Sequence, residues 1–103
     1  MPACIVGLAH TPFGKHDAES VESLIVRVAR DALNDAGIAA GDVDEIVLGH
    51  FNAGFSPQDF TAALVLQADP AFRFKPATRV ENACATGSAA VQQGLKAIAA
   101  KNA

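Results

Sequence analysis

The sequence predicts an α/β fold in which helices cover a parallel sheet. Short apolar runs alternate with longer segments whose apolar residues recur at helical spacing, giving the order strand, helix, strand, helix, strand, helix. The first two strand-like runs are apolar on nearly every position, which is typical of strands that helices cover from both sides. Strands that alternate with helices in this way are expected to run parallel and to be joined by right-handed crossovers.

The first strand is expected over residues 3–8, which read Ala-Cys-Ile-Val-Gly-Leu. Cys4 would then be a small buried hydrophobic residue. The next element is predicted as a helix, with Ser20 as its N-cap and Gly37 just after its end. Its apolar stripe consists of Val21, Leu24, Ile25, Val28, Ala29, Ala32, Leu33 and Ala36.

A second strand is predicted over residues 45–49, followed by a loop rich in Gly, Asn and Phe. Pro57 is expected to open a helix over residues 58–68. A third, weaker strand is predicted over residues 77–81. The last helix is expected from Ala85 to about residue 100, with its small, uncharged first turns buried. A buried helix start and a three-stranded sheet need further elements to cover them, and the sequence contains none after the last helix. This suggests truncation.

Composition excludes several classes of function. The chain has 103 residues, a formal charge of −3 and scattered basic residues, so a nucleic-acid partner is not expected. Neither a signal peptide nor an apolar run of membrane-spanning length is visible, which favours a cytoplasmic protein without a membrane partner. Cys4 and Cys84 are expected as free thiols. No metal is expected, because neither cysteine has a ligand-spaced neighbour and the three histidines lie apart from both.

Cys84 is the candidate catalytic residue. It lies between the end of a predicted strand and the start of a helix, where free backbone amides and the helix dipole favour the thiolate form. A thiolate can act as a covalent acyl acceptor, and the Cys84 amide could donate to a developing oxyanion. A buried packing role is also common for a Cys beside alanines. His50 follows a strand at the same sheet edge, where it fits a loop hydrogen bond better than the role of a base.

The segment Cys84-Ala85-Thr86-Gly87 resembles the N-terminal nucleophile motif of the thiolases, which include the acetyl-CoA acetyltransferases. The opening run with Thr11-Pro12-Phe13-Gly14-Lys15, and residues 46–49 with the Gly/Asn loop, also resemble that family in the same order. The similarity covers essentially the whole chain. Many thiolases have Asn three residues before the nucleophile, whereas Glu81 stands there in this chain, as in the sterol-carrier-protein-2-type subgroup.

The resemblance implies the βαβαβα portion of the thiolase-fold N-terminal domain over residues 1–103, with the C-terminal half absent. It implies a ping-pong acyl-CoA C-acyltransferase of lipid metabolism, in which Cys84 forms an acyl thioester during Claisen condensation or thiolytic cleavage of a 3-ketoacyl-CoA. Coenzyme A thioesters would be substrates, with no permanently bound cofactor, and the assembly would be a homodimer or homotetramer. Residues that bind coenzyme A cannot be named in this chain. In the family the activating His, a second Cys and part of the oxyanion hole come from the C-terminal half, so the chain alone is expected to be inactive.

Two alternatives stay open at this point. A decarboxylating 3-ketoacyl synthase shares the fold and has a Cys at a helix start, although the opening strand and the turn at residues 11–15 favour a thiolase. The chain could also be a non-catalytic piece, either a truncated product or one chain of a split assembly. A downstream His with a second Cys in the parent gene would support a thiolase.

Overall fold

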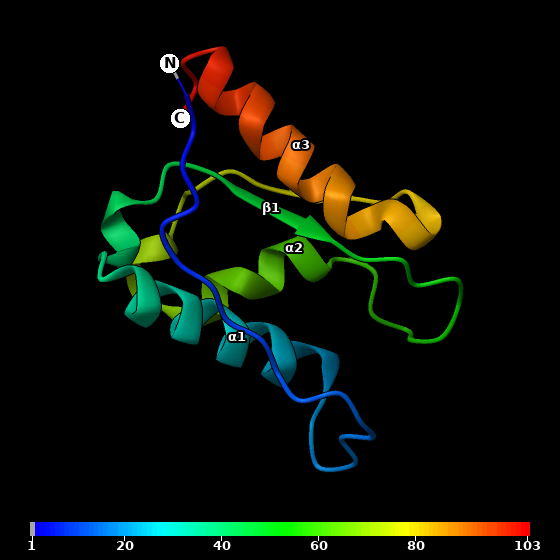
Figure 1. Ribbon diagram of the computed structural model, residues 1–103. Helices are drawn as coiled ribbons and strands as arrows, with labels where there is room; N and C mark the ends of the chain where they lie inside the picture. The colour runs from blue at the N-terminus through cyan, green and yellow to red at the C-terminus, as the bar shows by residue number, and fades with distance from the viewer. Residues whose placement is uncertain (1) are drawn as a thin grey trace.

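The structure, a computed structural model, describes residues 2–103 as a small parallel sheet between helices (Figure 1). Strands β1 (Ile46–Gly49) and β2 (Ala77–Val80) pair in parallel, with Ile46 opposite Ala77 and Gly49 opposite Val80. In Figure 1, helix α3 (Thr86–Ala99) lies on one side of β1, and α1 (Val21–Ala36) with α2 (Thr61–Leu64) lies on the other. The predicted α/β class is therefore confirmed.

Helix α1 begins and ends where the sequence predicts. The Ser20 side chain accepts a hydrogen bond from the Ser23 amide at 3.0 Å, and the Ser23 hydroxyl accepts one from the Ser20 amide at 2.7 Å. This reciprocal pair satisfies two amides that have no partner inside the helix. Gly37 ends α1 with φ 68°, a left-handed conformation that Gly adopts without steric cost.

The core lies where α1 meets the short helical turns that follow α2. Its buried members come from four different segments, so it joins the first half of the chain to the second. They are Ala40, Ile46, Val65, Ala68 and Phe72. From α1, Ile25, Ala29 and Leu33 pack against this cluster, which confirms part of the predicted apolar stripe. The Arg30 side chain adds a hydrogen bond of 2.8 Å to the carbonyl of Ala68.

The predicted first strand is wrong, because residues 3–8 form no strand in this structure. The segment runs past α1 instead, and the Leu8 amide donates to the Asp35 carboxylate at 2.8 Å. Gly7 packs so closely on α1 that a Cβ there would lie 2.6 Å from the Cβ of Ala36. Ile5 is 89% exposed and Cys4 is also exposed, so the expected burial of Cys4 is wrong as well.

The later helices depart from prediction in two further ways. Pro57 does not open a helix, because the loop continues to Phe60 and α2 begins at Thr61, continuing as a 3-10 turn over Val65–Ala68. In α3 only Thr86 is buried, whereas its first turns were expected to be buried as a whole. The second and third strands are confirmed to within one residue at their ends. Among residues 2–103, no helix is both long enough and apolar enough to cross a membrane.

Candidate active site

Cys84 lies in a single 3-10 turn, Ala83–Ala85, that connects β2 to α3. The connection is short, because only Glu81 and Asn82 separate the turn from the end of β2. Cys84 is exposed and forms no disulfide bond. The structure therefore has the expected arrangement, an accessible thiol just before the N-terminus of a helix of 14 residues.

The backbone before Cys84 has an unusual conformation. Ala83 has φ 45°, in the left-handed region that residues with a Cβ seldom adopt. Two hydrogen bonds support this turn. The Ala85 amide donates to the Asn82 carbonyl at 2.8 Å, and the Ala83 amide donates to Oε1 of Glu81 at 3.2 Å. Glu81, the residue that departs from the common thiolase pattern, thus contacts the residue next to Cys84.

Thr86 supplies the remaining support for the turn. Its Oγ1 accepts a hydrogen bond from the Asn82 amide at 2.9 Å and donates one to the Ala83 carbonyl at 2.6 Å. Thr86 is 7% exposed although its neighbours in the turn are exposed. One buried hydroxyl therefore joins two backbone groups that precede Cys84.

The end of β1 lies directly against this turn. A Cβ on Gly49 would be 2.9 Å from both Cγ2 and the carbonyl oxygen of Thr86. Real Cβ atoms do not approach other atoms this closely, so only Gly fits at position 49 without a shift of the neighbouring backbone. In Figure 1 the β1 arrow points toward the start of α3 and the loop that follows β1. This is the carboxyl edge of the sheet, where sites of open α/β folds lie.

A second ordered segment, residues 50–60, leaves the same edge of the sheet. Asn52 is 4% exposed, and its Nδ2 donates to the Ser56 carbonyl and to Oδ1 of Asp59, both at 2.8 Å. Its Oδ1 accepts from the Ser56 amide at 2.8 Å. The same loop carries three exposed aromatic side chains, Phe51, Phe55 and Phe60.

Arg79 of β2 connects both ends of this loop to the sheet. Its Nε donates to the His50 carbonyl at 3.1 Å, and its Nη1 donates to the Asp59 carbonyl at 3.3 Å. The same Nη1 lies 3.8 Å from the Asp59 carboxylate. Sequence reasoning did not single out Asn52, Arg79 or Thr86. A signal exists only for Thr86, because Ser and Thr near a helix start commonly bond to the local backbone.

The histidines take structural positions. The His50 ring forms a hydrogen bond of 3.1 Å with the hydroxyl group of Thr61, which is fully buried. The expectation that His50 makes a hydrogen bond in the loop is therefore confirmed. His16 contacts the Pro12 carbonyl at 2.7 Å, and His10 lies edge-on to the Phe13 ring at 4.8 Å. Within the part of the chain that the structure describes, no recorded hydrogen bond joins a histidine to Cys84.

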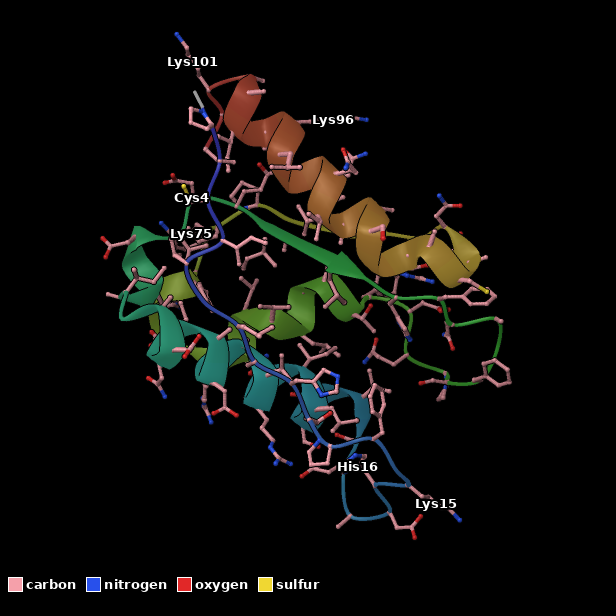
Figure 2. The ribbon with its side chains drawn as sticks, viewed as in Figure 1. Cys4, Lys15, His16, Lys75, Lys96 and Lys101 are labelled. Atoms are coloured by element: carbon pink, nitrogen blue, oxygen red, sulfur yellow. The ribbon has the colours of Figure 1, made fainter. Side chains whose placement is uncertain are left out.

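Cys4 lies elsewhere in the molecule. It lines a shallow groove between the N-terminal segment and the second half of α3, together with Val91, Gly94 and Leu95. Figure 2 shows Cys4 on the N-terminal segment, toward the opposite end of β1 from the start of α3. Residues 2–103 contain no group of three or more His, Cys, Asp or Glu side chains that could hold a metal ion.

Comparison with known proteins assigns the family. The acetyl-CoA acetyltransferase of Methanocaldococcus jannaschii is 38% identical over 96 residues, which cover 92% of this chain and 24% of that protein. The acetyl-CoA acetyltransferase of Methanothermobacter thermautotrophicus is 35% identical over 97 residues, or 92% and 25%. The chain thus spans about a quarter of the length of these curated relatives. The family description "Thiolase, N-terminal domain" matches residues 3–103, and the chain belongs to this family.

Proposed function

We propose that this chain is the nucleophile-bearing N-terminal part of a thiolase-type acyl-CoA C-acyltransferase, with Cys84 as the acyl acceptor. The observation that carries the proposal is the exposed Cys84 on a hydrogen-bonded turn between β2 and α3. The family match over residues 3–103 and the similarity to two acetyl-CoA acetyltransferases support it. Cys4 is also exposed, but it lies on a segment without secondary structure.

In the proposed first half-reaction, the Cys84 thiolate attacks the carbonyl carbon of an acyl-CoA. A new C–S bond forms to Cys84, and the C–S bond to coenzyme A breaks, so coenzyme A leaves as the thiol after taking up the proton that Cys84 released. A backbone amide at the turn before α3 would donate to the oxyanion of the tetrahedral intermediate. The Cys84 amide remains our candidate for this role.

In the second half-reaction, a second acyl-CoA, deprotonated at its α-carbon, attacks the Cys84 thioester and forms a 3-ketoacyl-CoA. Cys84 leaves as the thiolate, and the reverse reaction is thiolytic cleavage. This ping-pong scheme needs a base for the α-proton, and His50 is engaged with Thr61. We propose that the activating His and a second Cys lie in the part of the parent protein that corresponds to the other three quarters of the relatives. The 103-residue chain alone would then be inactive in condensation.

Glu81 supports a finer proposal, membership of the sterol-carrier-protein-2-type subgroup. Its carboxylate accepts the Ala83 amide at 3.2 Å, so in this chain the residue three before Cys84 has a definite place in the turn. Coenzyme A thioesters would serve as substrates rather than as bound cofactors. A cytoplasmic homodimer or homotetramer acting in lipid metabolism is the setting that we propose for the parent enzyme.

Competitive alkylation tests the nucleophile assignment. The chain would be treated with less than one equivalent of iodoacetamide, and both cysteine-containing peptides would be quantified by mass spectrometry. We expect Cys84 to be modified about tenfold faster than Cys4, since both thiols are exposed but only Cys84 directly precedes the N-terminus of a helix of 14 residues. The matched variants Cys84→Ser and Cys4→Ser assign each mass unambiguously. Faster modification of Cys4 would overturn the proposal.

A further inference from the structure

We infer that Thr86 is a positioning residue for Cys84, through a hydroxyl group that fixes the turn from which the sulfur is presented. This inference rests on the proposed function, because the positioning has a purpose only if Cys84 reacts. Thr86 itself would touch neither the substrate nor the reacting atoms. It would act on the backbone of the residues that lead into Cys84.

The hydroxyl of Thr86 uses both of its hydrogen-bonding capacities on that backbone. It accepts from the Asn82 amide at 2.9 Å and donates to the Ala83 carbonyl at 2.6 Å. These groups lie one and two residues before Cys84, whereas Thr86 lies two residues after it. Cys84 is therefore the central residue of a turn that is closed by a side chain.

The conformation of Ala83 indicates that this closure is needed. A residue with a Cβ stays at φ 45° only where its surroundings hold it there. Two side chains bond to the peptide groups of Ala83: the Thr86 hydroxyl donates to its carbonyl, and the Glu81 carboxylate accepts from its amide. The Ala83 carbonyl also accepts the backbone amide of Thr86. If the hydroxyl is removed, the chain can return to commoner angles at Ala83, and Cys84 then turns with it.

The methyl group of Thr86 fixes the orientation of the hydroxyl. Cγ2 is the atom that a Cβ on Gly49 would meet at 2.9 Å, so the methyl faces the end of β1. Because a β-branched side chain has few allowed χ1 angles, placing the methyl against Gly49 also places the hydroxyl on the turn. Thr86 thereby connects the edge of the sheet to the turn Ala83–Ala85 that carries Cys84, which we call the nucleophile turn.

Such positioning matters for acyl transfer because the sulfur has to approach the carbonyl carbon at a set distance and direction. Cys84 is exposed, so packing does not restrict its backbone. The restriction has to come from hydrogen bonds in the turn, and Thr86 supplies two of them.

The test compares Thr86→Val, which keeps the shape but removes the hydroxyl, with Thr86→Ser, which keeps the hydroxyl. Iodoacetamide rate constants would be measured for Cys84 and Cys4 in the same molecule, with Cys4 as the internal reference. We expect Thr86→Val, which removes both hydroxyl bonds, to lower the Cys84 rate about tenfold or more and to leave the Cys4 rate unchanged. Thr86→Ser keeps the hydroxyl but loses the methyl group that orients it, so it should slow Cys84 clearly less than Thr86→Val does.

A purely structural role would give a different pattern. Loss of folding would change the iodoacetamide rate constants of both thiols together, and it would be visible in the circular dichroism spectrum. Should Thr86→Val fail to fold, Glu81→Ala removes the other partner of Ala83 from an exposed position, and it should slow Cys84 severalfold without affecting Cys4. An unchanged or faster Cys84 rate in folded Thr86→Val, or in Glu81→Ala where Thr86→Val does not fold, would overturn the role of Thr86. Preferential modification of Cys4 in the unaltered chain would instead overturn the proposed function.

Discussion

Gly49 and Thr86 are in such close contact that a Cβ on Gly49 would lie 2.9 Å from Cγ2 of Thr86 and 2.9 Å from its carbonyl oxygen. The last residue of β1 is thereby packed against the first residue of α3. Since Thr86 also bonds to the backbone before Cys84, the sheet edge and the nucleophile turn are mechanically connected. A substitution at Gly49 should therefore alter the position of the turn that carries Cys84.

Replacing Gly49 with Ala should destabilise the chain by about 1–3 kcal/mol, because the new methyl overlaps backbone as well as side-chain atoms. The free energy of unfolding would be measured by urea denaturation. Gly94→Ala in the middle of α3 is the matched control, since a Cβ there meets no atom within 4 Å. This control should gain about 0.5–1 kcal/mol from helix propensity. The explanation fails if both variants shift stability in the same direction.

Local signals in the sequence predicted α1 well. Ser20 and Gly37 act at its two ends through contacts with residues only a few positions away, so no knowledge of the rest of the fold was needed. The place of Cys84 was predictable for a similar reason, because a strand run followed by small residues indicates a strand-to-helix turn. Thr86 was harder to recognise, since the close approach of Gly49 depends on how β1 packs against α3.

Hydrogen bonds that an apolar pattern or a proline cannot reveal explain the two larger errors. An apolar run such as residues 3–8 is equally consistent with a strand and with an extended segment, and which one forms depends on a hydrogen-bonding partner far away in the sequence. Here the Leu8 amide bonds to Asp35 of α1. Pro57 looked like a helix start, but Asn52 organises the following residues as a loop, and its bonds to Ser56 and Asp59 delay the helix to Thr61.

Replacing Arg79 with Lys should loosen the loop of residues 50–60. A lysine ammonium cannot reproduce the separate bonds that Nε and Nη1 make to the carbonyls of His50 and Asp59. We expect amide exchange of the loop, reported by Phe55 and Ser56, to quicken about tenfold. Arg73→Lys is the matched control, because Arg73 lies over the exposed Phe74 ring. Equal exchange in the two variants would contradict this role of Arg79.

The outer edge of β2 should mediate pairing with a second copy of the chain. Within residues 2–103, β2 pairs only with β1, so its other edge has free backbone groups. The amides of Ile46 and His50 donate to Pro76 and Val80, and in parallel pairing this register directs the Ala77 amide away from β1. Light scattering at micromolar concentration should therefore report a dimer, and Ala77→Pro should weaken it. If the unsubstituted 103-residue chain is a monomer under these conditions, the prediction is contradicted.

Replacing Asp35 with Ala should release the N-terminal segment from α1. The Asp35 carboxylate accepts the Leu8 amide at 2.8 Å, and this bond adds to the close contact of Gly7 with Ala36. Without it, the Leu8 amide should exchange with solvent about tenfold faster, since a segment with few buried contacts opens locally rather than with the whole fold. Asp31→Ala, one turn earlier on the same helix, is the control and should leave Leu8 exchange unchanged. If both variants accelerate it equally, the effect reflects the stability of α1 and not the Asp35 bond.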